Sequence, residues 1–439
     1  MSTDLDNSSL KVFMLGWEFP PFISGGLGTA CYGLTRAMDS LGIRVSFVLP
    51  KVVSGEYTSH VKLLTPNSSK RMTSSYSIKE LTNVMFHSIA STLQPYSLPE
   101  QYQQTEEQSE LIRERLDLPQ STSGQACNGV HYGQDMYSEV HRYAAVAASL
   151  ALDESFDLIH AHDWMTYPAG MAAAAVTGKP LVVHVHSTEF DRSGEHVNQM
   201  IYDIERAGME QADKIIAVSH YTRNIVISRY GIPGDKVEVV HNGVESNGAW
   251  SLMNTGIEND EKIVLFLGRI TMQKGPEYFL RAAQKVINVM DNVKFVVAGS
   301  GDMMNRTINM AAELGIGNKV LFTGFLRGDE VRQIYQMADV YVMPSVSEPF
   351  GIAPLEAMNH DVPVIISKQS GVSEVLNHAL KVDFWDVDEI ANKIVAVLKY
   401  PPLQLTLRNH GNFEVRKLQW KDSAQKCASI YEDVLMAVC

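Results

Sequence analysis

The feature that most constrains the fold is an alternation of short apolar segments with helical sequence, repeated in both halves of the chain. In the first half, "KVFMLGW" (11–17), "RVSFVLP" (44–50) and "FDLIHAHDW" (156–164) are apolar at their centres and separated by helical or loop sequence. The second half repeats the pattern from "EKIVLFLGRI" (261–270) onwards. This alternation predicts an α/β fold with doubly wound parallel sheets, whose ligands bind beyond the strands' carboxyl ends.

Chain length and one polar segment predict two such domains. At 439 residues the chain exceeds the size at which a single core usually stops growing. The segment 245–260 is polar and glycine-containing, so the domain junction is expected there. We expect two Rossmann-like domains, 1–248 and 256–410, facing each other across a cleft. Residues 411–439 are expected to form an amphipathic helix that crosses back to the first domain.

One long interval departs from the alternation. Residues 52–138 are rich in Ser, Thr, Gln and Tyr and contain only short apolar pieces. An interval of this length without a clear pattern predicts a functional insertion in the first domain rather than two further regular units.

Charge and cysteine content narrow the range of partners. The net charge is −13, which disfavours nucleic acids and anionic lipids bound through a broad basic surface. No run of eighteen apolar residues occurs, and "MSTDLDNSSL" lacks the pattern of a signal peptide, so no membrane span is expected. The four cysteines are scattered without a C-x-x-C pair, which favours a reducing compartment. We therefore expect a cytoplasmic protein.

Two glutamates flank a loop in "SEPFGIAPLEAM" (347–358), directly after an expected buried strand. Pro354 suits the first position of a helix, which would place Glu356 in the first helical turn and Glu348 just past the strand. Unpaired N–H groups between them would then form an anion site at the helix N-terminus. The alternative is an ordinary strand-loop-helix corner, with Glu356 interacting with the helix dipole.

Two cations follow the first strand of the second domain. Arg269 and Lys274 lie five residues apart in "LGRITMQKG" (267–275), where an arginine fork and a lysine charge can hold a diphosphate. The alternative is a solvated basic loop.

Two glycine-rich loops carry weaker signals. "FISGGLGTA" (22–30) is not a P-loop, and "AGSGDMM" (298–304) has Met304 where a dinucleotide fingerprint needs its third glycine. Both loops are therefore compatible with plain tight turns.

Histidine pairs close two expected strands, in "HAHDW" (160–164) and "HVHS" (184–187). Residues i and i+2 share a face of a strand, so each pair can reach one ion, which raises a metal-hydrolase hypothesis. Trp164 and Met165 follow where an H-x-H-x-D-H zinc motif would continue, and this argues against a metal. The pairs are otherwise core histidines, or catalytic and substrate-binding histidines at the floor of the cleft.

Together these motifs resemble the retaining GT-B glycosyltransferases, in the branch of glycogen and starch synthases. Six segments carry the resemblance in the right order along nearly the whole chain: "GWEFPPFISGGLG", "HAHDW", "HSTEFDR", "VVHNGV", "GRITMQKG" and "EPFGIAPLE", the last matching an E-x7-E element. Two departures are Ser24, which precedes the glycines where glycogen synthases carry a lysine and a hydrophobic pair, and "QSGVSE" in place of a double glycine before Glu374. The first leaves the choice of donor and acceptor open.

The resemblance implies transfer of glucose, with retention, from ADP-glucose or UDP-glucose to the non-reducing end of an α-1,4-glucan, without cofactor or metal. It implies catalytic roles for His162, Arg269, Lys274 and Glu348. Donor-binding residues would be Gly26, Gly28, Arg269, Lys274, Gly301, Phe350, Gly351, Ile352 and Glu356, with Glu356 on the ribose and Glu348 on the sugar. Acceptor-binding residues would be His186 and Glu189.

Other functions remain open at this stage. They are transfer to a small molecule or a lipid, epimerisation of a nucleotide sugar, and sugar sensing without turnover. The tyrosines of the 52–138 interval suit stacking on the rings of an acceptor sugar, or form a small core of their own. They are Tyr57, Tyr76, Tyr96, Tyr102, Tyr132 and Tyr137.

Overall fold

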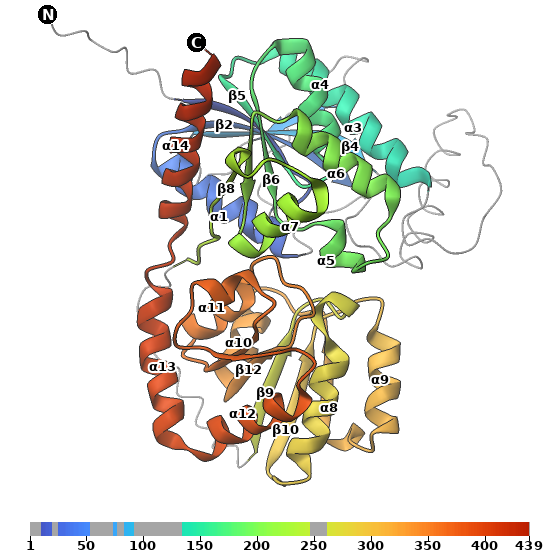
Figure 1. Cartoon of the computed structure of the whole chain (residues 1–439), viewed down its shortest axis with the longest axis vertical. Coiled ribbons are helices and arrows are strands. Elements are labelled where there is room, and N and C mark those ends of the chain that lie inside the picture. The colour runs from blue at the N-terminus through green and yellow to red at the C-terminus, as the bar shows by residue number, and fades with distance from the viewer. Residues whose placement is uncertain are drawn as a thin grey trace, which may run out of the picture. The chain divides into compact units, whose positions relative to one another are not determined.

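The computed structural model describes residues 10–19, 25–52, 73–76, 83–91, 134–245 and 261–438. Contacts divide the chain into two compact units, each with strands and helices that alternate along the chain (Figure 1). The first unit comprises Met1–His184, Asp203–Ile215 and Cys427–Cys439, and the second comprises Val185–Tyr202 and Ile216–Lys426.

The first sheet has eight strands in the order β3-β4-β2-β1-β5-β6-β7-β8. Strand β4 pairs parallel with β2 and antiparallel with β3, and the pairs that join β2, β1, β5 and β6 are all parallel. The strands are β1 Lys11–Leu15, β2 Arg44–Val52, β3 Thr73–Tyr76, β4 Val84–Ser91, β5 Leu158–His162, β6 Leu181–Val185, β7 Lys214–Ala217 and β8 Val237–Val239. Every residue of β5 and β6 is buried, as expected for strands covered on both faces.

Helices follow most strands of this sheet. They are α1 Gly26–Ser40, α3 Gln134–Asp153, α4 Tyr167–Thr177, α5 Glu189–Ser193, α6 Gln199–Gln211 and α7 His220–Tyr230, with the 3₁₀ turn η1 Gly234–Lys236. Small residues let them pack closely. A Cβ at Gly170 would lie 2.9 Å from Leu181 Cδ1, and one at Gly208 would lie 2.5 Å from the Tyr167 ring. Glycine therefore brings α4 close to both β6 and α6.

The second sheet has six strands in the order β11-β10-β9-β12-β13-β14, all in parallel pairs. Numbered from β9, this is the 3-2-1-4-5-6 order of a doubly wound nucleotide-binding sheet. The strands are β9 Lys262–Leu267, β10 Val293–Ala298, β11 Val320–Gly324, β12 Val340–Met343, β13 Val364–Ser367 and β14 Leu380–Val382.

Alternate residues of β9 point into two separate cores. Val264 and Phe266 pack with residues of α8 and α12, whereas Ile263 and Leu265 pack with residues of α10 and α11. Both faces of the sheet are thus covered by helices. The helices are α8 Pro276–Ile287, α9 Met304–Glu313, α10 Asp329–Met337, α11 Ile352–Asn359, α12 Val387–Lys399, α13 Pro401–Val415 and α14 Trp420–Val438, with 3₁₀ turns η2 Met272–Lys274, η3 Gly317–Lys319 and η4 Gly371–Glu374.

The prediction of an α/β fold with two Rossmann-like sheets is confirmed. The interval 52–138 is more regular than expected, because β4 joins the sheet beside β2 and α3 begins at Gln134. Apart from Val52, Asn83 and strand β3, the rest of that interval lies outside the described residues, as does most of the expected domain junction at 245–260. Strand β14 was not expected from the sequence. Among the described residues, no helix is long and apolar enough to cross a membrane.

Candidate active site

The order of the second sheet fixes where a ligand would bind. Successive connections run in opposite directions from β9 and β12, which lie side by side, and ligands of doubly wound sheets bind at such a switch point. The loops that follow these two strands are joined directly, since Val346 N donates to Gln273 O at 2.9 Å. Gly275 has φ 66°, and a Cβ there would lie 2.2 Å from Pro344 O. Glycine is required for the two loops to meet.

The same contact brings together two residues predicted separately from the sequence. Lys274 Nζ lies 2.5 Å from Glu348 Oε2, and the side chains are only 21% and 7% exposed. Ser345 Oγ donates to the same oxygen at 3.2 Å. Arg269 lies half-buried on the loop that carries Lys274. A lysine ammonium and a buried carboxylate therefore meet at the carboxyl ends of β9 and β12, on loops of which one also carries Arg269.

The backbone of Glu348 is held as firmly as its side chain. Its N–H donates to Gln369 O at 2.9 Å, and Gly371 N donates to its carbonyl at the same distance. These bonds form an isolated parallel bridge between Glu348 and Ser370, on the loop after β13. The loops after three adjacent strands of the sheet, β9, β12 and β13, thus fix the position of this carboxylate.

Helix α11 begins two residues earlier than the sequence predicts. It starts at Ile352, so Pro354 is its third residue rather than its first, and Glu356 lies in the second turn rather than the first. The cause is Gly351, which caps the helix at φ 105° and whose added Cβ would lie 3.2 Å from Glu348 Cγ. The helix N-terminus is therefore adjacent to Glu348, and its first N–H groups have no carbonyl partner within the helix. The buried Phe350 precedes the cap.

The second glutamate is held by a buried tyrosine. Tyr335 Oη donates to Glu356 Oε2 at 3.1 Å and lies 3.2 Å from Ala353 O. Burial raises the pKa of Glu356, and the hydrogen bond from Tyr335 opposes that shift. Glu356 is thus oriented before any ligand arrives.

Gly301 supports the loop that carries Arg269. A Cβ at Gly301 would lie 2.2 Å from Ile270 O, and Ile270 N donates to Ser300 O at 2.9 Å. The glycines after β10 are therefore needed for close packing of backbone on backbone.

The first sheet has a switch point of its own, between β1 and β5. A pocket there is lined by Trp17, Glu18, Leu27, His162, Asp163, Trp164 and Met165. Glu18 is fully buried, and Asp163 is buried in the left-handed region at φ 59°. Sequence reasoning missed both residues, although an acid inside the apolar run "LGWEF" is a visible signal. Gly26 and Gly28 are the first and third residues of α1 rather than loop residues.

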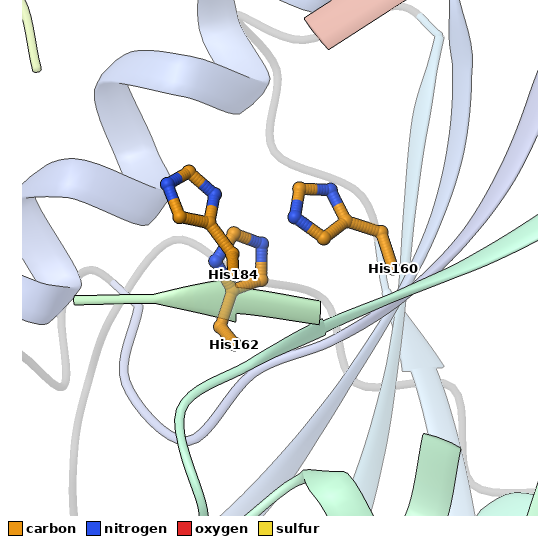
Figure 2. Close-up of side chains that lie close together, drawn as sticks. All are labelled: His160, His162 and His184. Carbon is orange, nitrogen blue, oxygen red and sulfur yellow. The ribbon is translucent and has the colours of Figure 1, made fainter. Parts of the chain in front are cut away.

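Three buried imidazoles lie close together (Figure 2), and one of them, His162, lines this pocket. His162 is opposite His184 in the register of β5 and β6, and His160 shares the face of His162. Their ring centroids are 4.3 Å (His160 and His162), 5.3 Å (His160 and His184) and 5.2 Å (His162 and His184) apart. The sequence instead suggested pairs within each strand. Strand β6 ends at Val185, so His186 lies just beyond the strand that carries His184.

The ring geometry bears on metal binding. One nitrogen from each ring can be chosen so that all three lie within 4.8 Å of one another. Tetrahedral zinc needs ligand nitrogens about 3.4 Å apart, with lone pairs that converge from the planes of the rings. The planes here are within 28° of parallel, so the lone pairs of stacked rings do not meet at one point. Metal binding by the three rings in this arrangement would therefore require at least one ring to turn.

The two residues predicted for the acceptor lie beyond β6. Burial lowers the pKa of His186 to about 3, so this imidazole is neutral near neutral pH. Glu189 is 1% exposed and accepts hydrogen bonds from Arg192 Nε at 3.0 Å, Ser193 Oγ at 2.6 Å and Asn198 N at 3.1 Å. The Glu189 carboxylate thus anchors the short helix α5. Its acceptor role stays a prediction.

Comparison with known proteins agrees with this architecture. Family models match two parts of the chain: "Glycosyltransferase Family 4" over residues 129–247 and "Glycosyl transferases group 1" over residues 253–412. Sucrose-phosphate synthase from Thermosynechococcus elongatus shares the fold, with a TM-score of 0.73 at 19% identity over 98% of this chain and 100% of that one. The two family models and the fold together indicate a GT-B glycosyltransferase.

Sequence relatives place the chain more closely. An uncharacterised glycosyltransferase of Methanocaldococcus jannaschii is 30% identical over 96% of this chain and 98% of its own length. A glycogen synthase of Mycobacterium tuberculosis is 24% identical over 96% and 94% of the two chains. The chain belongs to the group 1 glycosyltransferases.

Proposed function

We propose that this glycosyltransferase moves glucose from ADP-glucose or UDP-glucose to the non-reducing end of an α-1,4-glucan, with retention of configuration and without a metal ion. The observation that carries the proposal is the contact between Lys274 and Glu348, beside the N-terminus of α11. It combines a cation, a carboxylate and the first N–H groups of a helix at the switch point of a nucleotide-binding sheet.

The chemistry of glycosyl transfer explains the need for these groups. The nucleoside diphosphate leaves as the sugar becomes oxocarbenium-like, so negative charge grows on the leaving phosphate. Lys274 and Arg269 would stabilise that charge, as fixed donors do in an oxyanion hole. Binding of the diphosphate would draw Lys274 away from Glu348, which frees the Glu348 carboxylate to accept hydrogen bonds from sugar hydroxyls.

The remaining roles follow from the same assignment. Glu356, oriented by Tyr335, would accept hydrogen bonds from the ribose hydroxyls. His162 would contact the donor sugar. The leaving phosphate itself would accept the proton of the acceptor hydroxyl, so the mechanism needs no separate general base.

The glucan acceptor is the more specific part of the proposal. Support comes from the motif resemblance and from the relative named glycogen synthase, which aligns over nearly the whole chain. Of the six tyrosines in the polar interval, Tyr137 lies on α3 with its ring 6.3 Å from Trp164, which lines the first-unit pocket. Tyr76 is in β3, and the other four lie outside the described residues. Tyr137 thus offers an aromatic surface near that pocket.

The proposed location is the cytoplasm. Cys31 and Cys427 are buried and form no disulfide with another described residue, which fits a reducing compartment.

Nucleotide release with and without acceptor tests the proposal. The protein is incubated with UDP-glucose or ADP-glucose, in the presence or absence of maltooligosaccharides and with EDTA throughout. We expect release that depends on the maltooligosaccharide. Release without acceptor, accompanied by an altered free monosaccharide, would indicate an epimerase. Donor binding without release under any condition would indicate a sensor.

A further inference from the structure

A tyrosine from the C-terminal helix reaches the histidine cluster. Tyr431, on α14, is fully buried, and its hydroxyl oxygen lies 2.5 Å from His160 Nδ1. The two residues are 271 positions apart in sequence and belong to the same compact unit. We propose that Tyr431 is a positioning residue that holds His160, and through it His162, in the orientation and protonation state needed for transfer. The functional part of this inference rests on the proposed role of His162.

The direction of the hydrogen bond follows from the surroundings of the hydroxyl. Among the described residues, His160 Nδ1 is the one hydrogen-bond partner of Tyr431 Oη. A buried hydroxyl proton needs an acceptor, so it points to Nδ1. Burial also raises the pKa of Tyr431 well above its ordinary value, so the phenol keeps its proton. His160 is then neutral and carries its own proton on Nε2.

The orientation of the His160 ring affects that of His162 because the two rings are stacked. The two ring planes are 28° apart with centroids at 4.3 Å, and Figure 2 shows the rings grouped together with that of His184. Phe47 stacks with His162 at 6.4 Å and 16°. Rotation of the His160 ring would therefore disturb the stack in which His162 is held.

The protonation state of His160 affects that of His162 in the same way. A protonated His160 cannot accept from the Tyr431 hydroxyl, so the hydrogen bond opposes its protonation. Two imidazolium rings stacked at this distance would repel each other, so a neutral His160 leaves His162 free to change its own protonation. Among the described residues, the other titratable groups near the stack and the adjoining pocket include His184 of β6, Cys427 of α14, and Glu18 and Asp163, which interact with the buried Cys31 of α1.

The test removes only the hydroxyl. We expect Tyr431→Phe to lower kcat about three- to tenfold, the range of one net hydrogen bond. We also expect the acid limb of kcat/KM against pH to move up by about half a unit to one unit, because His160 then binds a proton more readily. Tyr143→Phe is the matched control, since it removes a buried hydroxyl that donates to Val48 O at 2.9 Å. Tyr143→Phe should lower the free energy of unfolding without moving the acid limb of kcat/KM against pH.

Repeating the substitution in a His160→Asn variant tests whether the effect of Tyr431 acts through His160. His160→Asn removes the titratable ring, so adding Tyr431→Phe to it should move the acid limb no further. An equal shift in both backgrounds, or no shift in the single variant, would overturn the proposal.

The tautomer is measured independently of activity. Imidazole ¹⁵N NMR of the full-length wild-type protein should show His160 with Nε2 protonated and Nδ1 unprotonated. A proton on Nδ1 would overturn the inference even in an active enzyme. Absence of transferase activity with the expected tautomer would instead refute the proposed function.

Discussion

The switch points of the two sheets are formed by different kinds of side chain. In the second unit, the loops after β9 and β12 bring together an ammonium and a carboxylate, 2.5 Å apart and mostly buried. In the first unit, the corresponding position is backed by three stacked imidazoles and a tyrosine hydroxyl. Similar topology therefore serves different chemistry. Under the proposed function, the ion pair would suit a ligand whose charge grows during reaction, and the buried stack would suit a ligand that must be oriented.

The largest effect is expected at the charged switch point. Lys274→Ala should lower kcat by about 10² to 10³, because a fixed cation is lost where charge develops on the leaving diphosphate. Steady-state kinetics with UDP-glucose or ADP-glucose would measure it. The control is Lys285→Ala, whose ammonium pairs at 2.7 Å with Asp388 and is 45% exposed. A change in KM alone for the Lys274 variant would mean that Lys274 only binds the donor. The charged switch point would then not differ from the first one in stabilising charge that grows during reaction.

The two glutamates of the second unit are predicted to have different roles. Glu356→Ala should chiefly weaken donor binding by about 1.5 to 3 kcal/mol, through lost hydrogen bonds from the ribose to a charged group. Glu348→Ala should instead lower kcat, since it would contact the sugar where charge develops. Donor titration calorimetry and kinetics separate these effects.

Tyr335→Phe is the control for Glu356, because it removes the orienting hydroxyl but leaves the carboxylate. Its effect on donor affinity should be smaller than that of Glu356→Ala. Equal losses of binding from both glutamate variants, with kcat unchanged, would show that one of the two roles is wrongly assigned.

A smaller effect concerns the pH dependence of stability. Burial lowers the pKa of His186 from 6.5 to about 3 in the folded chain. The unfolded chain therefore binds more protons between these values, so the free energy of unfolding should rise with pH across that window. One such group contributes at most about 1.4 kcal/mol per pH unit.

Urea denaturation at several pH values would measure this slope, and His186→Asn should make it shallower. His378→Asn is the control, since His378 is half-exposed and hydrogen-bonded to Glu414 at 3.2 Å. An unchanged slope in the His186 variant would mean that this imidazole is not buried as a neutral group.

The smallest expected effect is that of chelation. EDTA should leave turnover nearly intact, and metal analysis of the purified protein should find no stoichiometric zinc. In the proposed mechanism Lys274 and Arg269 stabilise the leaving group in place of a metal, and the lone pairs of the stacked imidazoles do not converge on one point. Activity lost on chelation and restored by zinc or magnesium would favour the metal-hydrolase hypothesis.

Most strands were predictable because each is a continuous apolar run, as buried parallel strands are. The start of α11 was not, because it depends on the positive φ of Gly351 rather than on Pro354. Strand β4 was missed because its interval is polar overall.

The contacts at the two sites needed the structure. The sequence placed Lys274 and Glu348 at strand ends, but their contact depends on β9 lying beside β12, which is a nonlocal pairing. In the same way, His184 joins His160 and His162 through the register between β5 and β6. Local patterns predict elements, whereas the partners across a sheet depend on topology.

The structure of the product tests the central claim most directly. With a maltooligosaccharide acceptor, mass spectrometry should show chains lengthened by one glucose for each nucleotide released. NMR should show the new residue α-linked at the non-reducing end. A β-linkage would contradict retention, and transfer only to a monosaccharide or a lipid would contradict the glucan acceptor.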